Sequence, residues 1–177
     1  MLDANHLPLT DGRARLRSMT HADATLYADG TEDAAVRKYA HLPAARYTPQ
    51  SVRRMIDSSL AEGLARGDLA VLTVADAATD RFVGSLVLFD VSDDAAEVGF
   101  WMRPEARGAG LAGAALGLAA RLARRSGLRT LTARTLVENH ASRHVLGRAG
   151  FVPGEQARST APSGELLEMI PYQRLLT

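Results

Sequence analysis

Residues 95–113 read AAEVGFWMRPEARGAGLAG, a strand-like pattern followed by a glycine-rich loop and the start of a small-residue helix. Glycines and small residues let successive backbone amides point into one concavity. The helix that follows adds its free N–H groups and the positive end of its dipole. The stretch therefore predicts a phosphate-binding loop, formed by Gly108, Ala109, Gly110, Leu111 and Ala112.

The same loop also matches the dinucleotide-binding pattern, as Gly108-x-Gly110-x-x-Gly113. A strand of the dinucleotide-binding fold is buried on both faces and reads continuously apolar, whereas the strand here carries Glu97. No acidic residue lies about 20 residues further on to bind a ribose. An NADP-binding domain is therefore the weaker interpretation, and a loop that only turns the chain is another alternative.

Before this stretch, two segments, residues 69–75 and 82–89, are mostly apolar and flank a turn-like segment. This pattern predicts a β-hairpin. The connections are too short for a parallel crossover, so these two strands and residues 95–102 should be antiparallel. After it, we expect a helix over 111–125, a strand over 129–136, a helix over 139–149 and a strand from 151. A last strand over 166–175 contains Pro171, which predicts an edge position or a bulge.

The first third of the chain predicts one strand and three helices. Residues 13–19 alternate as a strand, and Thr20 with Asp23 forms a capping-box pattern for a helix to about residue 29. Thr31 is expected to cap a helix to residue 39. Thr48-Pro49 should open a helix that ends near residue 66. Residues 1–177 are thus expected to form one α+β (mixed α/β) domain. Its central sheet would be mostly antiparallel, with about six to seven strands and helices on both faces.

The composition narrows the classes of function. The chain has 177 residues, 46% hydrophobic and 23% charged, and no cysteine, which excludes disulfides, thiolate nucleophiles and cysteine-ligated zinc. No apolar run approaches the ~18 residues of a membrane span and no signal peptide is visible, so we expect a cytoplasmic protein without membrane contact. His140 and His144 have helical spacing but no further ligand pattern, so no metal is expected.

Charge is distributed unevenly along the chain. Seven arginines and one acid, Glu105, lie between residues 103 and 134, after an acidic stretch at residues 90–97. Few aromatic residues interleave with these arginines. The pattern favours a compact anionic ligand over nucleic acid.

Two motifs resemble those of the GNAT superfamily of N-acetyltransferases, in particular the Rim-type protein N-terminal acetyltransferases. Arg107-x-x-Gly110-x-Ala112 is similar to the GNAT acyl-CoA signature, and residues 137–151, VENHASRHVLGRAGF, resemble the later Asn-x-x-Ser-x-x-Val-Leu…Gly-Phe segment. The resemblance covers residues 69–175 well, and residues 13–66 agree in element order only. It implies transfer of an acetyl group from acetyl-CoA to a primary amine, either a protein N-terminus or a small molecule.

The resemblance also implies a set of donor-binding residues. The strand before the loop should carry a bulge and splay from its neighbour, so that its main chain can pair with pantetheine like an added strand. Phe100, Trp101 and Met102 are assigned to this pairing, and Asn139 to a hydrogen bond with the pantetheine arm. Three arginines could neutralise phosphate or could simply be solvated, namely Arg107, Arg143 and Arg148.

Two residues are candidates for the chemistry. Glu97 resembles in position the glutamate that some GNAT members use as a general base, and the alternatives are a solvated strand residue or a hydrogen-bond anchor. Many members donate a proton from a tyrosine seven residues after the motif asparagine, but that position is Leu146 here. The resemblance to the Rim-type enzymes implies Ser142 as the substitute acid, and the alternative is that it bonds a backbone carbonyl one turn back. The missing tyrosine leaves open a catalytically silent acyl-CoA-binding module.

The acceptor side is expected to be formed by the helices of residues 20–66 and by the loop over 157–164. Glu32, Asp33, Glu62 and Glu168 could attract a cationic amine. A C-terminal strand at the sheet edge would let two copies pair as a homodimer.

Overall fold

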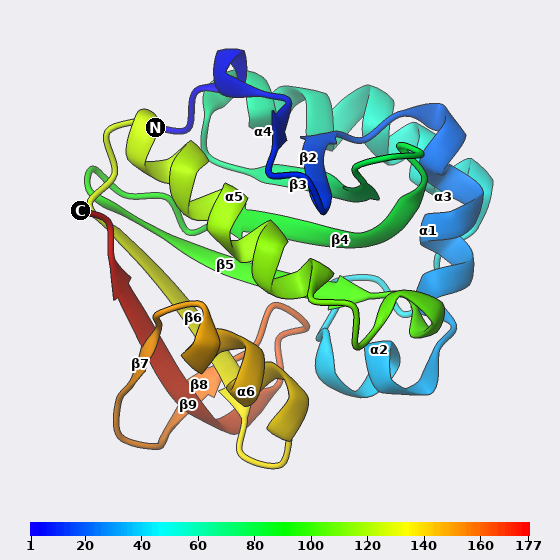
Figure 1. Cartoon of the computed structure of the whole chain (residues 1–177). Helices are drawn as coiled ribbons and strands as arrows, with labels where there is room; N and C mark the ends of the chain where they lie inside the picture. Colours follow the sequence, from blue (N-terminus) through cyan, green and yellow to red (C-terminus); the bar gives the residue numbers. More distant parts are fainter.

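One mixed sheet of nine strands organises the computed structural model, which describes all residues 1–177 (Figure 1). The strands lie in the order β1-β2-β3-β4-β5-β6-β9-β7, with β8 also paired to β9. Every pair is antiparallel except β5 with β6. The bounds are β1 Leu9–Thr10, β2 Ala14–Ser18, β3 Ala70–Asp76, β4 Phe82–Phe89, β5 Ala95–Met102, β6 Thr130–Leu136, β7 Val152–Pro153, β8 Ala157–Thr160 and β9 Leu166–Leu175.

The mostly antiparallel sheet and its α+β class agree with the prediction. Two strands exceed the expected six to seven, the two-residue β1 and the four-residue β8. Both are too short to give a readable alternation in the sequence.

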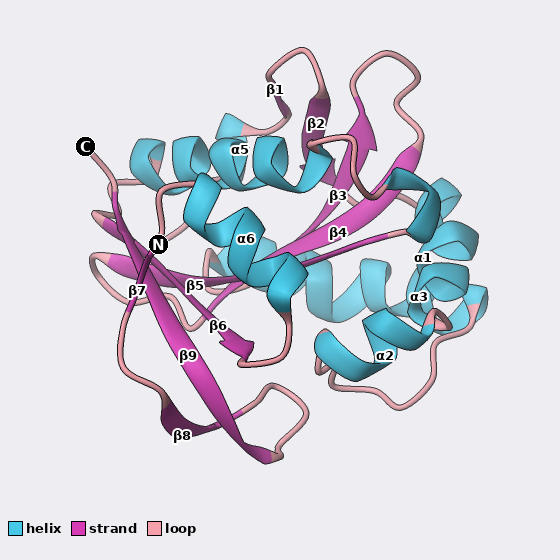
Figure 2. Ribbon diagram, turned by 60° about the horizontal axis from the view of Figure 1, so that its bottom comes forward, coloured by secondary structure: helices cyan, strands magenta, loops and turns pink.

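Helices cover both faces of the sheet, as predicted. Helix α5 crosses one face, where it packs with α6 over a core that includes Leu72, Leu86 and Leu116 (Figures 1 and 2). The N-terminal helices cover the other face, around Tyr27, Phe82 and Trp101. The bounds are α1 Ala24–Thr31, α2 Ala34–Tyr39, α3 Pro49–Met55, α4 Ala61–Arg66, α5 Leu111–Arg125 and α6 His140–Arg148. No helix is both long and apolar enough to cross a membrane.

The N-terminal helices differ from the prediction in detail. Thr20 and Asp23 do form a capping box, although on a 3₁₀ turn that precedes α1. Helix α2 is capped by Asp33, whose side chain accepts from the Val36 amide, so the assignment of Thr31 as its cap is wrong. Thr31 ends α1 and its hydroxyl donates to the Ala28 carbonyl. The helix expected over 48–66 contains a π-helical turn, Ile56–Leu60, between α3 and α4.

Strands β5 and β6 separate part-way along their length. They pair only at Ala95↔Thr130, Ala96↔Leu131 and Glu97↔Thr132. Beyond this point β5 stays on β4 and β6 stays on β9, so residues 98–102 have no strand partner on the β6 side. The expected splay is confirmed, but the expected bulge in β5 is wrong. Its register with β4 is unbroken, and the only shift nearby lies in the pairing of β3 with β4, where Val74 pairs with Gly84 and Ala75 with Phe82.

The C-terminal strand is not an edge strand. β9 lies between β6 on one side and β7 and β8 on the other, so the predicted edge position is wrong and pairing of two copies through this strand has no basis. The Pro171 carbonyl accepts from the Gly154 amide, on the side away from β6. The nitrogen of Pro171, which has no hydrogen to donate, points to this same side, between β7 and β8. The proline therefore removes no backbone hydrogen bond between β9 and β6.

Candidate active site

The glycine loop is an open turn that leads directly into α5. Gly108 and Gly110 have φ of 79° and 76°, in the left-handed region that side chains disfavour. Gly110 is the N-cap residue of α5, and no side chain caps the helix. A Cβ at Gly108 or Gly113 would meet no atom within 4 Å. The first amides of α5 are therefore uncapped beside open space, as a phosphate site requires.

A cavity of about 810 Å³ extends from this loop to the splay between β5 and β6. Its walls come from the loop, the end of β5, α2 and α6. Most of the predicted donor-binding residues line it, namely Phe100, Trp101, Met102, Arg107, Gly108, Gly110, Leu111, Ala112, Asn139 and Arg148. Ala109 and Arg143 do not. The unpaired side of β5 and the uncapped helix thus open into one space, which fits an extended ligand with a phosphorylated end. We call this space the donor channel.

The arginines predicted to meet phosphate have different surroundings. The Arg107 guanidinium donates to the Met102 carbonyl at 3.0 and 3.2 Å and to Asp33 at 2.5 Å, so it ties the end of β5 to α2. Arg143 donates to the Val137 carbonyl at 3.0 Å and does not line the channel. Arg148 lines the channel and forms no hydrogen bond or ion pair with the protein.

Arg13 is a third arginine at the channel, and no sequence motif pointed to it. It follows β1 and lines the channel, and a Cβ at Gly110 would lie 2.8 Å from its Nη1. Arg13 is distant from the loop in sequence and belongs to an ordinary strand-like alternation. Only the packing of α5 across β2 brings it to the loop.

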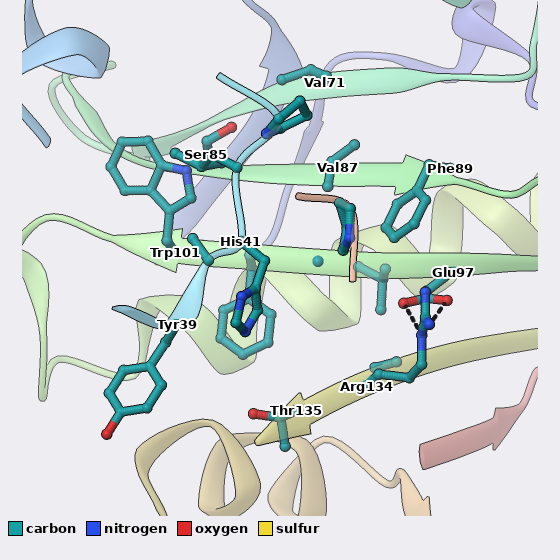
Figure 3. Close-up of a pocket in the computed structure, with 18 of the residues that line it drawn as sticks. Tyr39, His41, Val71, Ser85, Val87, Phe89, Glu97, Trp101, Arg134 and Thr135 are labelled. Carbon is teal, nitrogen blue, oxygen red and sulfur yellow. Dashed lines mark hydrogen bonds and ion pairs between the residues drawn. The ribbon is translucent and has the colours of Figure 1, made fainter. Parts of the chain in front are cut away.

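A second cavity, of about 500 Å³, lies on the opposite face of β5 (Figure 3). Its lining is mostly apolar and aromatic, with Tyr27 in edge contact with Trp101 at 5.3 Å and with Tyr47 at 5.5 Å between ring centroids. The two cavities share six lining residues around the splay, namely Tyr39, Ala40, Phe100, Trp101, Asn139 and Ser142. Molecules bound in the two cavities would therefore meet at the unpaired end of β5. We call the second cavity the acceptor cavity.

Glu97 lines the acceptor cavity as half of an ion pair. The Arg134 Nε donates to both carboxylate oxygens, at 2.9 and 3.0 Å, and the Arg134 Nη1 donates to the Thr160 carbonyl at 2.8 Å (Figure 3). Burial raises the pKa of Glu97, although Arg134 opposes the shift. The alternative of a solvated strand residue is wrong, since 13% of its side chain is exposed.

The partner of Glu97 was also missed, although a signal existed. Arg134 lies two positions after Thr132, which pairs with Glu97. Alternation along a strand places residues two apart on the same face. This pattern identifies Arg134 only once the parallel pairing of β5 with β6 is known.

Ser142 lies where the two cavities meet. The Asn139 side chain caps α6 by accepting from the Ser142 amide at 3.2 Å, and its Nδ2 donates to the Ser142 Oγ at 3.0 Å. Ser142 makes no bond to a carbonyl one turn back, so that alternative is wrong and its own proton stays free to be donated. Leu146, at the position of the missing tyrosine, is buried in the core.

The chain matches the family model of the acetyltransferase (GNAT) domain over residues 13–152. It belongs to the GNAT acetyltransferase family. The match includes the N-terminal helices, beyond the range in which the sequence motifs were clear. The enzyme is therefore an acyl-CoA-dependent N-acetyltransferase with acetyl-CoA as its donor. The weaker interpretation as an NADP-binding domain is not supported.

Solved structures confirm the fold of this GNAT enzyme. The Mycobacterium smegmatis RimJ in complex with CoA-disulfide has a TM-score of 0.81 at 20% identity, over 92% of this chain and 81% of that one. A ribosomal-protein-S5-alanine acetyltransferase from Vibrio fischeri has a TM-score of 0.78 at 18% identity, over 96% and 97%. RimL, a ribosomal L7/L12 α-N-protein acetyltransferase, has a TM-score of 0.80 at 17% identity, over 95% and 97%. No curated protein sequence matches the chain.

No metal site accompanies the two cavities. No group of three or more His, Asp or Glu side chains is arranged to hold an ion. The acids suggested to attract a cationic acceptor also lie elsewhere, since none lines the acceptor cavity. Asp33 pairs with Arg107, Glu32 with Arg37, Glu62 with Arg66, and Glu168 accepts from Gln156.

Proposed function

We propose that this GNAT enzyme transfers the acetyl group of acetyl-CoA to a primary amine by direct attack while both substrates are bound. The observation that carries the proposal is the meeting of the two cavities at the unpaired end of β5. Neither cavity contains a cysteine, because the chain has none, so an acyl-cysteine intermediate is excluded. A ternary complex needs no covalent enzyme intermediate.

The donor channel suits the chemistry of CoA. Amides of Gly108, Ala109, Gly110, Leu111 and Ala112 are proposed to bind the pyrophosphate at the start of α5. The main chain of residues 100–102 would pair with the amides of pantetheine in place of the missing β6 partner. Arg13 and Arg148 are the cations with free guanidinium groups along this channel, whereas Arg107 and Arg143 act within the protein.

Two residues are proposed to act at the thioester. The Ser142 hydroxyl accepts from Asn139 and can give its own proton to the departing sulfur. Glu97 as the general base stays a prediction. Its raised pKa supports the role, but both of its oxygens already accept from Arg134.

The acceptor is proposed to be an amine on an apolar or aromatic skeleton, or an N-terminus with a small or apolar first residue. Tyrosines, Trp101 and aliphatic side chains supply most of the cavity surface, and the only acid, Glu97, is paired. A polyamine would leave a second charge unpaired against this surface, at a desolvation cost.

Thiol release from acetyl-CoA tests the proposal. The panel would include 2-phenylethylamine, spermidine and hexapeptides beginning with alanine or serine. We expect 2-phenylethylamine or a peptide to release thiol and spermidine to be slow. Thermal shifts with CoA and NADPH would accompany the assay, and only CoA should stabilise the fold. A clear shift with CoA but no thiol released with any amine would favour a silent acyl-CoA-binding module.

A further inference from the structure

His41 is an unusual residue of the acceptor cavity. It lies in the segment between α2 and α3, and its φ of 48° places a non-glycine residue in the left-handed region. Such a conformation is strained and persists only where the surroundings enforce it, often at functional sites. Its side chain lies in front of β5, between Trp101 and the Glu97–Arg134 pair (Figure 3).

The imidazole has an unused nitrogen. Its Nε2 is buried and has no hydrogen-bond partner. Buried polar atoms nearly always have one, so an orphan that faces a substrate cavity indicates a partner that the substrate brings. Burial lowers the pKa of His41, which keeps the ring neutral at pH 7 and able to accept a proton.

The other ionisable groups around this cavity are less able to accept a proton. Arg134 occupies both oxygens of Glu97. Burial raises the pKa values of Tyr27 and Tyr47, so both stay protonated. Glu138, before α6, and Glu165, before β9, act on His41 through space and oppose the lowering of its pKa, and neither lines the cavity. The charged and titratable groups around His41 are thus those that line the same cavity, Tyr27, Tyr39, Tyr47, Glu97 and Arg134, and the two that act on it through space, Glu138 and Glu165.

We infer that His41 is a catalytic residue that accepts the proton of the incoming ammonium group, directly from the amine. This role rests on the proposed acetyl transfer. The ammonium gives one proton to the Nε2 of His41, and the freed lone pair forms the C–N bond with the acetyl carbon. The C–S bond breaks, and the sulfur leaves with the second amine proton, through Ser142. His41 then releases its proton to solvent, so one ammonium ion and one acetyl-CoA give one amide, one thiol and one proton.

Two variants test the role. Asparagine tolerates the left-handed backbone, so His41→Asn should fold normally. Loss of a general base predicts a 10²- to 10⁴-fold fall in kcat, measured by thiol release with 2-phenylethylamine or the alanine peptide. Wild-type kcat should decline as the pH falls through the lowered pKa of His41, and the variant should lose this limb. His41→Gly should regain activity with added imidazole, which a purely structural role would not allow.

The controls separate the outcomes. His21→Asn, at an exposed histidine outside both cavities, should keep wild-type kcat. If the wild type acetylates no amine, the proposed function is overturned and the role of His41 with it. If the wild type is active but His41→Asn keeps both kcat and the acid limb, only the role of His41 is overturned. Loss of that limb in Glu97→Gln instead would assign the proton to Glu97.

Discussion

Replacing Gly110 by alanine should weaken CoA binding at a predictable cost. Gly110 begins α5 with φ of 76°, a conformation that costs an L-residue roughly 1–2 kcal/mol. The new Cβ would also lie 2.8 Å from Nη1 of Arg13, so this flexible side chain must move away from the channel. The loop can relieve the strain by turning its backbone, but the amides at the start of α5 would then no longer converge on the phosphates.

The strain must therefore appear either in stability or in affinity. If the loop keeps its shape, the free energy of unfolding should fall by about 1–2 kcal/mol. If the loop relaxes, CoA should bind about 5- to 30-fold more weakly, because that is the same energy expressed as an equilibrium ratio. Urea unfolding measures the free energy of unfolding, and calorimetric titration with CoA measures the affinity, both on the same preparation.

Gly117→Ala is the matched control. Gly117 lies within α5, and a Cβ there would meet no atom within 4 Å. Alanine should stabilise this helix by roughly 0.5–1 kcal/mol and leave CoA affinity unchanged. Wild-type stability together with wild-type affinity in Gly110→Ala would refute the reasoning, because the left-handed geometry of the loop would then have no energetic consequence.

Two further variants test the fold and the chemistry. The Asp23 carboxylate accepts from Arg17 at 2.7 and 2.9 Å; burial raises its pKa, but bonds from Arg17 and Thr20 outweigh this and lower it. Asp23→Ala should therefore cost about 3–5 kcal/mol of unfolding free energy at pH 7. Because the pKa of Asp23 is lower in the folded protein, its contribution to stability is complete above the unfolded pKa of about 3.9. The contribution is lost as the pH falls through the lower folded pKa. The unfolding free energies of the wild type and of Asp23→Ala, measured over a series of acidic pH values, test this. Ser142→Ala should lower kcat by less than about tenfold, since a thiolate leaves readily; an unchanged kcat would remove Ser142 from the mechanism.

The sequence predicted those features that leave a local chemical signal. Thr48-Pro49 marked the start of one helical segment, and the glycines at 108 and 110 marked the loop. The π-helical turn between α3 and α4 has no comparable signal. The splay of β5 was expected from the family resemblance and not from the residues. The wrong position of β9 arose because strand order is a property of the whole sheet.

The site residues that were missed depend on tertiary structure. Arg13 reaches the glycine loop because α5 packs across β2, and Arg134 reaches Glu97 because β5 and β6 are parallel. His41 belongs to an irregular segment whose left-handed residue no pattern predicted. Each is an ordinary residue in the sequence, and only its neighbours in space make it part of the site.

Hydrogen exchange with and without CoA, resolved to individual amides, tests most directly where the donor binds. We predict that CoA slows exchange at the amides of residues 108–112 and at the unpaired end of β5, residues 98–102. The surface of β1 and β2 away from the channel should be unaffected. Saturation with CoA without slower exchange in either segment would contradict the assignment of the loop and the splayed strand as the binding site.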